Sequence, residues 1–321
     1  MKFFKKTFFS IVFFIFFLEF FFQLIFFLNI GDTKKLILFY NPYCDENYWK
    51  KNNSFSFDSK KFNKHQTLSV IRKENEEFYE KKIIDNKKKD NVFYGSSFID
   101  HNFFRANIKS KYNYALKSYG LDQIYLSYTL TKNNHKGDNI IIGFLPEDLD
   151  RSIFSKREYD KIKFVKQNEK FILTNHPVVI KDHFVIDFLT YKFLKNIFFL
   201  ITNEYDYKKS KCEKIKKVEL FNFFLSNIIK DTHNLKQNLI IVLFQFKENI
   251  GNNDNWRYEI METFFNKKKI QYIDTKKLFQ NDSKFQKHGI DIFFNEEDNH
   301  YSKYGFKITY DEINNVIKQY K

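Results

Sequence analysis

A long apolar segment at the start of the sequence limits how the rest of the chain can be placed. Lysines at the extreme N-terminus precede a run from Phe8 to Ile30 that is almost entirely Phe, Ile, Leu and Val. A helix of this length spans about 34 Å, enough to cross a hydrocarbon core of about 30 Å. The run is longer than the core of a typical signal peptide, and no small-residue cleavage site follows it. Residues 1–30 therefore predict an uncleaved signal anchor with one transmembrane helix.

Two polar residues interrupt this run. Glu19 and Gln23 are four residues apart and so share one face of a helix. A carboxylate at mid-membrane costs about 2.5–3.5 kcal/mol, which the apolar neighbours offset. Either the polarity is tolerated, or Glu19 is protonated or pairs with another membrane helix, which would make a membrane-protein partner possible. The leading lysines favour a cytoplasmic N-terminus, with Lys34 and Lys35 weakening that bias, so the remaining domain is expected on the periplasmic or cell-surface side.

The rest of the chain divides into a polar segment and an α/β region. Residues 31–90 predict a juxtamembrane stalk and cap, with a charged helix candidate at 74–82. From residue 91, apolar strands alternate with amphipathic helices, which predicts a parallel, doubly wound sheet over 91–321. An insertion at about 150–215 holds a hairpin and a helix at 188–199. The expected strands are 91–94, 112–116, 139–144, 239–246 and 270–273, and the main expected helices are 121–128, 218–229, 256–266 and 301–319.

Charge and cysteine content bound the possible partners. The net charge is +15, but the lysines are spread along the chain among Asp and Glu, which indicates a solvated surface and no nucleic-acid partner. Cys44 and Cys212 are far apart and lack metal-site spacing. They could pair outside the cytoplasm, and two free thiols are the favoured interpretation. The sequence predicts no metal site and no cofactor.

Three predicted strands are followed by residues that suit acyl chemistry. Ser97, Gly120 and Glu147 each come after a strand, and the carboxyl ends of parallel strands meet along the edge where ligands bind. His300 lies just before the last helix, from which it could reach the same edge.

Acyl transfer needs a nucleophile, a base, a group that orients the base, and donors for the oxyanion. Ser97 is the candidate nucleophile and His300 the candidate base. Asp298 or Glu297 could hold the imidazole, with Asp298 favoured. The backbone N–H groups of Ser97 and Gly120 could face the oxyanion, because a glycine permits close backbone approach.

Four short motifs in order resemble the blocks of the SGNH (GDSL-type) esterase and acyltransferase superfamily. They are Tyr94-Gly95-Ser96-Ser97-Phe98, Ser118-Tyr119-Gly120-Leu121-Asp122-Gln123, Ile142-Gly143-Phe144-Leu145-Pro146-Glu147-Asp148 and Asp298-Asn299-His300-Tyr301-Ser302-Lys303-Tyr304-Gly305. The resemblance covers about residues 90–320. It implies a flavodoxin-like three-layer sandwich with a parallel sheet, Ser97 as nucleophile, Gly120 as oxyanion glycine and His300 as base. A membrane anchor carrying one Glu is also familiar among tethered members of this superfamily.

Two residues depart from the superfamily pattern. Ser96 replaces the usual Asp of the first block, where a hydroxyl can still hydrogen-bond in the turn. Glu147 replaces an asparagine whose amide helps to stabilise the oxyanion, and an ionised carboxylate would repel that charge.

Two residues near the motifs are expected to have no catalytic role. His101 is expected to be solvated, with substrate contact as the alternative, and Arg151 is expected to pair with Asp148 rather than to bind an acidic sugar.

The sequence thus predicts a membrane-anchored serine esterase or O-acyltransferase. Its expected substrates are O-acyl esters, with O-acetyl favoured, carried by an envelope polysaccharide, or other small esters. The choice of a carbohydrate substrate rests on the resemblance alone. One alternative is a catalytically inactive SGNH-like domain that binds glycans or envelope partners, which Glu147 favours. Another is a basic membrane-surface scaffold, which only the charge favours.

Overall fold

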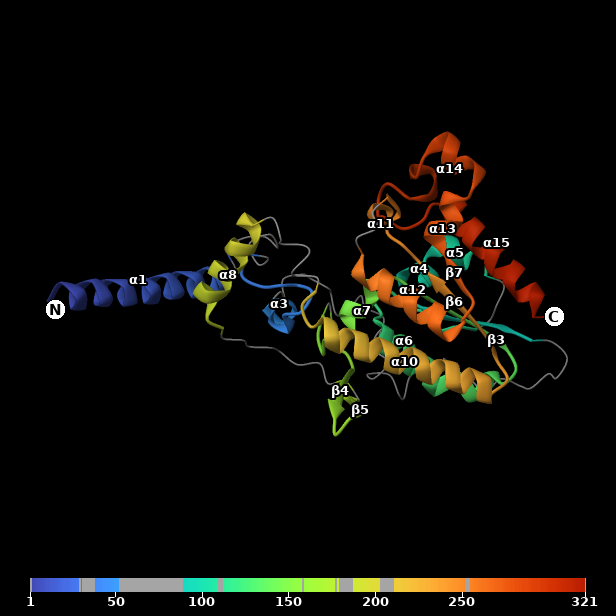
Figure 1. Ribbon diagram of the computed structural model, residues 1–321, viewed down its shortest axis with the longest axis horizontal. Helices are drawn as coiled ribbons and strands as arrows, with labels where there is room; N and C mark the ends of the chain where they lie inside the picture. Colours follow the sequence, from blue (N-terminus) through green and yellow to red (C-terminus); the bar gives the residue numbers. More distant parts are fainter. Residues whose placement is uncertain are drawn as a thin grey trace. The chain divides into compact units, whose positions relative to one another are not determined.

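Figure 1 shows the computed structural model, which describes residues 2–28, 30, 38–51, 89–108, 112–157, 159–176, 178, 187–202, 211–251 and 255–320. The chain forms two compact units. One comprises residues 1–61, 155–160 and 180–213, and the other comprises residues 62–154, 161–179 and 214–321. Parts of the expected insertion therefore belong to the same unit as the N-terminal helix. Most of the expected stalk, including the helix candidate at 74–82, lies outside the described residues.

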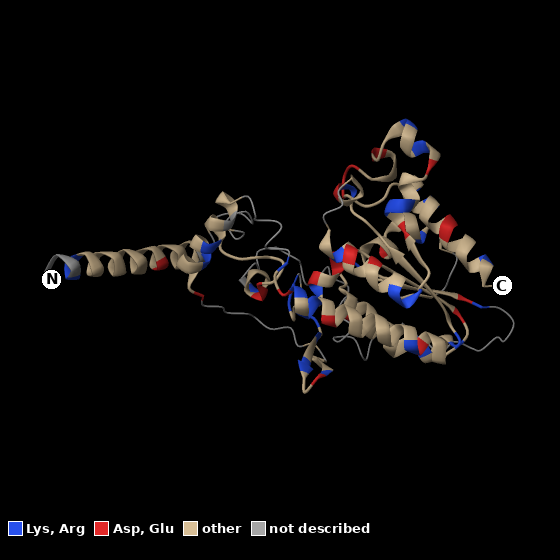
Figure 2. Cartoon of the chain, viewed as in Figure 1, with Lys and Arg blue, Asp and Glu red and all other residues tan. Residues whose placement is uncertain are grey.

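The first unit is built on one long apolar helix. Within α1 (Lys2–Phe27), the segment Lys5–Ile25 is long and apolar enough to cross a membrane. Figure 2 shows that charge is nearly absent along it. The unit also contains α3 (Glu46–Lys51) and α8 (Leu189–Ile201), and α8 packs against α1. The predicted N-terminal apolar helix is therefore present.

The two polar residues of α1 find partners within the chain. Glu19 accepts hydrogen bonds from the backbone N–H groups of Leu189 (3.0 Å) and Thr190 (2.8 Å), at the start of α8. The Gln23 amide donates to Glu19 Oε1 (2.7 Å) and to the Asp187 carbonyl (2.5 Å). The carboxylate that interrupts the apolar run thus satisfies the otherwise unpaired donors of a helix N-terminus.

A disulfide also belongs to this unit. Cys44 and Cys212 are bonded, with their Cα atoms 5.9 Å apart although 168 positions separate them in the sequence. The interpretation of two free thiols is therefore wrong. Spacing could not show the pairing, because it depends on the fold bringing the segments after α1 and after α8 together.

The second unit is an α/β domain. Its five-stranded sheet has the order β2-β1-β3-β6-β7, and every neighbouring pair is parallel, which confirms the parallel sheet. The strands are β1 (Asn91–Gly95), β2 (Tyr112–Asn113), β3 (Asn139–Phe144), β6 (Asn238–Leu243) and β7 (Tyr272–Asp274). An antiparallel hairpin, β4 (Lys163–Gln167) with β5 (Lys170–Thr174), stands apart from the sheet. The α-helices are α4 (Ser97–Asp100), α5 (Asn102–Arg105), α6 (Leu121–Thr131), α7 (Asp148–Arg151), α10 (Lys214–Asn234), α11 (Lys247–Gly251), α12 (Trp256–Lys268), α13 (Thr275–Gln280), α14 (Ser283–His288) and α15 (Lys303–Gln319), and the 3₁₀ turns are η3 (Lys132–His135) and η4 (Asp291–Phe293).

Helices cover both faces of the sheet (Figure 1). On one face, Phe93 of β1 belongs to a buried core with Phe98 and with Phe306 of α15. On the other face, Tyr94 packs edge-on against Tyr128 of α6, with ring centroids 5.7 Å apart. Because both faces are covered, a central strand such as β3 is apolar and buried along its whole length, as parallel strands usually are.

The structure differs from the sequence-based prediction mainly at element ends. The second strand is shorter than expected, although the N–H groups of Tyr114 and Leu116 still donate to the carbonyls of Phe93 and Gly95 in β1 (2.8 and 3.2 Å). The one-turn helices α4, α5 and α7 were not predicted, because a single turn has no apolar periodicity that a sequence could reveal.

Candidate active site

Ser97 lies where β1 turns into α4. Ser96 precedes the helix in extended conformation, and Ser97 is the first helical residue. The turn is tight: a Cβ on Gly95 would lie 2.4 Å from the Gly143 carbonyl oxygen, so only glycine fits there. Ser97 is half-buried, and neither its hydroxyl nor its backbone N–H makes a hydrogen bond to another described residue. Both groups are therefore available to a ligand.

The loops after β1, β2 and β3 are tied together beside Ser97. The Lys117 N–H, after β2, donates to Asp100 Oδ2 of α4 (3.1 Å). The Ser96 hydroxyl donates to Asp148 Oδ2 (2.6 Å), which also accepts from the Leu145 N–H (3.0 Å). The Ser96 hydroxyl thus bonds across to the third motif. Because both Ser96 and Asp148 are buried, this bond fixes the position of the β1 turn relative to the β3 loop.

Gly120 is buried at the start of α6. A Cβ there would lie 2.8 Å from Arg151 Cβ and 2.6 Å from Asp122 Oδ1, so the second and third loops touch at this glycine. Its N–H donates to the Gln123 side-chain oxygen (3.2 Å) in a capping arrangement. The expected oxyanion donor is therefore engaged within α6.

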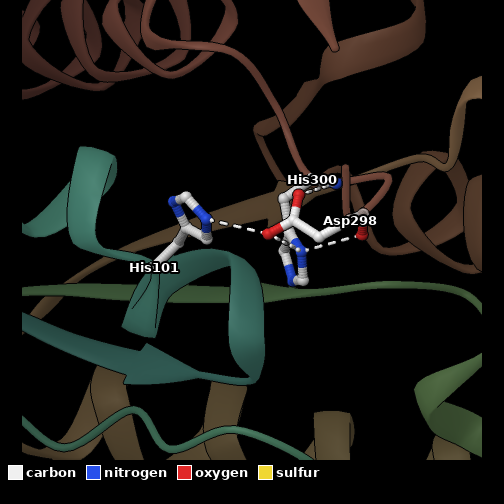
Figure 3. A group of neighbouring side chains, drawn as sticks. All are labelled: His101, Asp298 and His300. Atoms are coloured by element: carbon white, nitrogen blue, oxygen red, sulfur yellow. Dashed lines mark hydrogen bonds and ion pairs between the residues drawn. The ribbon is translucent and has the colours of Figure 1, made fainter. Parts of the chain in front are cut away.

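His300 is delivered to the same place from the other end of the chain. Its ring lies 4.8 Å, centroid to centroid, from Phe98, the residue after Ser97. His300 Nδ1 lies 3.1 Å from the Asp298 carbonyl oxygen and 3.3 Å from Asp298 Oδ2, so an Nδ1–H donates to Asp298 (Figure 3). The Asp298 carboxylate also accepts from the His300 backbone N–H (3.1 Å). This arrangement leaves Nε2 as the free nitrogen, and within the described residues no hydrogen bond joins it to Ser97.

Burial favours a neutral imidazole at His300. Burial lowers the pKa of His300, the Asp298 carboxylate opposes that shift, and His101 adds to it. Burial acts to raise the pKa of Asp298, but the hydrogen bond from the His300 N–H and the charges of both histidines leave it below its usual value. Glu297 is exposed, and its N–H donates to Asn295 Oδ1 (3.3 Å). No ion pair joins it to His300 among the described residues, which supports Asp298 over Glu297 as the partner.

His101 lies within the site, although the sequence favoured a solvated position for it. Its Nε2 lies 3.4 Å from Asp298 Oδ2, and its ring is stacked on His300 with centroids 4.9 Å apart (Figure 3). Its side chain is 13% exposed, so it is not the solvated residue expected. The signal available was its position four residues after Ser97. One ligand atom from each of His101, Asp298 and His300 lies within 4.8 Å of the others, a donor set that suits zinc or iron as well as proton transfer.

Glu147 is turned toward side-chain amides. Its Oε1 accepts from Asn249 Nδ2 and Asn255 Nδ2, both at 2.9 Å. Its Oε2 is buried without a hydrogen-bond partner among the described residues. Burial raises the pKa of Glu147, while Arg257 and the two amides act in the opposite direction. The carboxyl group therefore stands where an amide was expected, with two asparagine amides directly beside it.

Arg151 completes the rim of the site. Its Nε lies 3.4 Å from Asp148 Oδ1, which is the pairing that the sequence favoured.

No protein-family model and no curated protein matches the chain. The interpretation of the site therefore rests on its geometry and on the four motifs.

Proposed function

We propose that this protein is a membrane-anchored serine esterase or O-acyltransferase of the SGNH type. The observation that carries the proposal is the packing of His300 on Phe98, the residue after Ser97, with Asp298 hydrogen-bonded to Nδ1. Among the described residues, the Ser97 hydroxyl has no hydrogen-bond partner that would compete with this role. The strand order β2-β1-β3-β6-β7 matches that of flavodoxin-like sandwiches and supports the proposed fold family. In such sheets, ligands bind outside the carboxyl ends of the strands, where Ser97 lies.

The proposed reaction proceeds through an acyl-enzyme. Ser97 Oγ attacks the ester carbonyl while His300 Nε2 takes the hydroxyl proton, and Asp298 stabilises the imidazolium. The Ser97 N–H donates to the oxyanion, and the Gly120 N–H joins it on release from Gln123. Collapse expels the alcohol, which receives the proton from His300. Water or an acceptor hydroxyl then attacks the acyl-enzyme with His300 as base, and the proposed reaction uses no metal or cofactor.

The proposed location is the membrane, with α1 as a single-pass anchor and the α/β domain on the periplasmic or cell-surface side. The lysines before the apolar run support this orientation. The Cys44–Cys212 disulfide supports it independently, because disulfides persist in oxidising compartments. The proposed substrate is an O-acyl ester of an envelope polysaccharide, with O-acetyl favoured. This choice of substrate is supported by the resemblance to the superfamily.

Ester hydrolysis by the full-length chain in detergent tests this proposal. Release of p-nitrophenol from p-nitrophenyl acetate is compared between the wild type, Ser97→Ala and Ser283→Ala, an exposed serine in α14. We expect Ser97→Ala to lower kcat/KM by orders of magnitude and Ser283→Ala to leave it unchanged. Equal release by all three proteins would refute the esterase.

The second candidate is an inactive SGNH-like domain that binds glycans or envelope partners. Glu147 in place of the asparagine and the engagement of the Gly120 N–H by Gln123 both favour it, because each removes an oxyanion donor. Calorimetric binding of O-acetylated polysaccharide without any deacetylation would support this candidate.

A further inference from the structure

The amphipathic helix α8 has one face that the protein does not cover. Its exposed apolar side chains recur at intervals of three and four residues, so they form a single stripe. The stripe consists of Phe188, just before the helix, Tyr191, Leu194, Phe198 and Ile201, each 53–75% exposed. A contiguous exposed apolar surface of this kind marks an interaction site.

The opposite face of α8 is fixed to α1 and to the chain that follows it. Leu189 is fully buried in a cluster with Phe22 of α1 and with Phe39. The Phe193 ring lies 5.0 Å from that of Phe22 and 5.4 Å from that of Phe39. The Asn196 amide donates to the Leu38 carbonyl (3.0 Å). The uncovered stripe is therefore held facing away from α1.

The start of α8 lies at the level of the apolar part of α1. Glu19 holds the N–H groups of Leu189 and Thr190 through both of its carboxylate oxygens. Because Glu19 precedes Ile25, the end of the apolar span, by six residues, this junction is about 9 Å inside that end. Side chains of α1 close to the junction are themselves exposed and apolar, including Phe20 at 67%. The stripe on α8 therefore begins at the depth of exposed apolar side chains of α1.

We propose that α8 is a second membrane element, whose exposed stripe is buried in the lipid bilayer beside α1. This inference rests on the proposed anchoring by α1. A lipid occupant is favoured over a protein because α8 begins at the level of the apolar span of α1, whose exposed side chains the anchor presents to lipid. Lys195, exposed on α8, can extend its ammonium to the headgroups while its stem stays in the apolar layer. Glu19 then serves as an internal cap that joins the two membrane helices.

Spin labelling of the full chain in phosphatidylcholine nanodiscs tests the proposal. Labels are placed singly through Leu194→Cys and Phe198→Cys in α8. Phe16→Cys in α1, where Phe16 is 69% exposed, reports the anchor, and Ile215→Cys in α10, where Ile215 is 80% exposed, is the aqueous control. The native cysteines do not react because they form the disulfide. The readout is relaxation of each label by oxygen, which concentrates in lipid, relative to a water-soluble nickel chelate.

We expect the oxygen-to-nickel ratio at Leu194→Cys and Phe198→Cys to exceed that at Ile215→Cys several-fold, and to be highest at Phe16→Cys, which lies deeper in the apolar span. Ratios at the two α8 positions equal to Ile215→Cys, with Phe16→Cys still lipid-like, would overturn this inference and leave the anchor intact. A water-like ratio at Phe16→Cys would instead refute the anchor. Spectral broadening at Phe198→Cys that disappears on dilution with unlabelled chain would show that a second copy covers the stripe, and would also overturn the proposal.

Discussion

Asp298→Asn tests the assignment of the group that supports the base. The substitution keeps the shape and the acceptor for the His300 N–H but removes the charge facing the imidazolium formed during acyl transfer. The distance from Asp298 Oδ2 to His300 Nδ1 is 3.3 Å. At that distance a full ion pair is worth about 5 kcal/mol at an effective dielectric constant of about 20, and about 1.3 kcal/mol in water. Because the Asp298 side chain is 43% exposed, we expect screening to leave about 1–3 kcal/mol.

This energy corresponds to a loss of about 5- to 150-fold in kcat/KM. The assay is hydrolysis of p-nitrophenyl acetate across a range of pH, with Glu297→Gln as the matched control. Because the Asp298 charge acts against burial to raise the pKa of His300, its loss should also move the acid limb of the profile to lower pH. Unchanged kcat/KM in Asp298→Asn, or an equal loss in Glu297→Gln, would refute the reasoning.

Three further substitutions have defined outcomes. Ser96→Ala removes a buried hydrogen bond to the Asp148 carboxylate and should lower the free energy of unfolding by about 1.5–3 kcal/mol in urea titrations; no change would show that the bond is unimportant. Burial raises the pKa of Glu147 above its ordinary value of 4.5. Ionisation of Glu147 therefore lowers the free energy of unfolding as the pH rises from 4.5 through the raised pKa. Glu147→Gln should therefore raise Tm near neutral pH and not in acid, whereas a lower Tm at neutral pH would show that the charge is stabilising. The charge of His101 lowers the pKa of His300, so His101→Asn should move the acid limb of the kcat/KM profile to higher pH. An acid limb at the same pH would show that His101 does not affect the ionisation of His300.

The sheet and the meeting of the four motifs follow from local sequence signals. A strand such as β3 is recognisable because burial on both faces leaves an uninterrupted apolar run. Parallel pairing then brings the carboxyl ends of β1 and β3 to one edge, so Ser97 and Glu147 were expected near each other. The juxtaposition depends only on which segments are strands, not on their exact ends.

Contacts that depend on short, irregular segments could not be predicted in this way. His101 reaches Asp298 because α4 ends at Asp100 and His101 adopts an extended conformation (φ −68°, ψ 140°) before α5 begins. The partners of Glu147 are Asn249 within the short helix α11 and Asn255 at the start of α12, and the backbone partner of Glu19 is the start of α8. In each case the contact depends on where a short helix or a helix end is placed in the fold, which leaves no periodic signal in the sequence.

Covalent labelling of Ser97 tests the central claim most directly. The full-length chain is treated with a fluorophosphonate probe, and the modified residue is identified by mass spectrometry of its peptides. The proposed mechanism predicts one label per chain, on Ser97, with labelling abolished in Ser97→Ala and strongly slowed in His300→Ala. An unlabelled Ser97, or a rate that His300→Ala does not change, would contradict it.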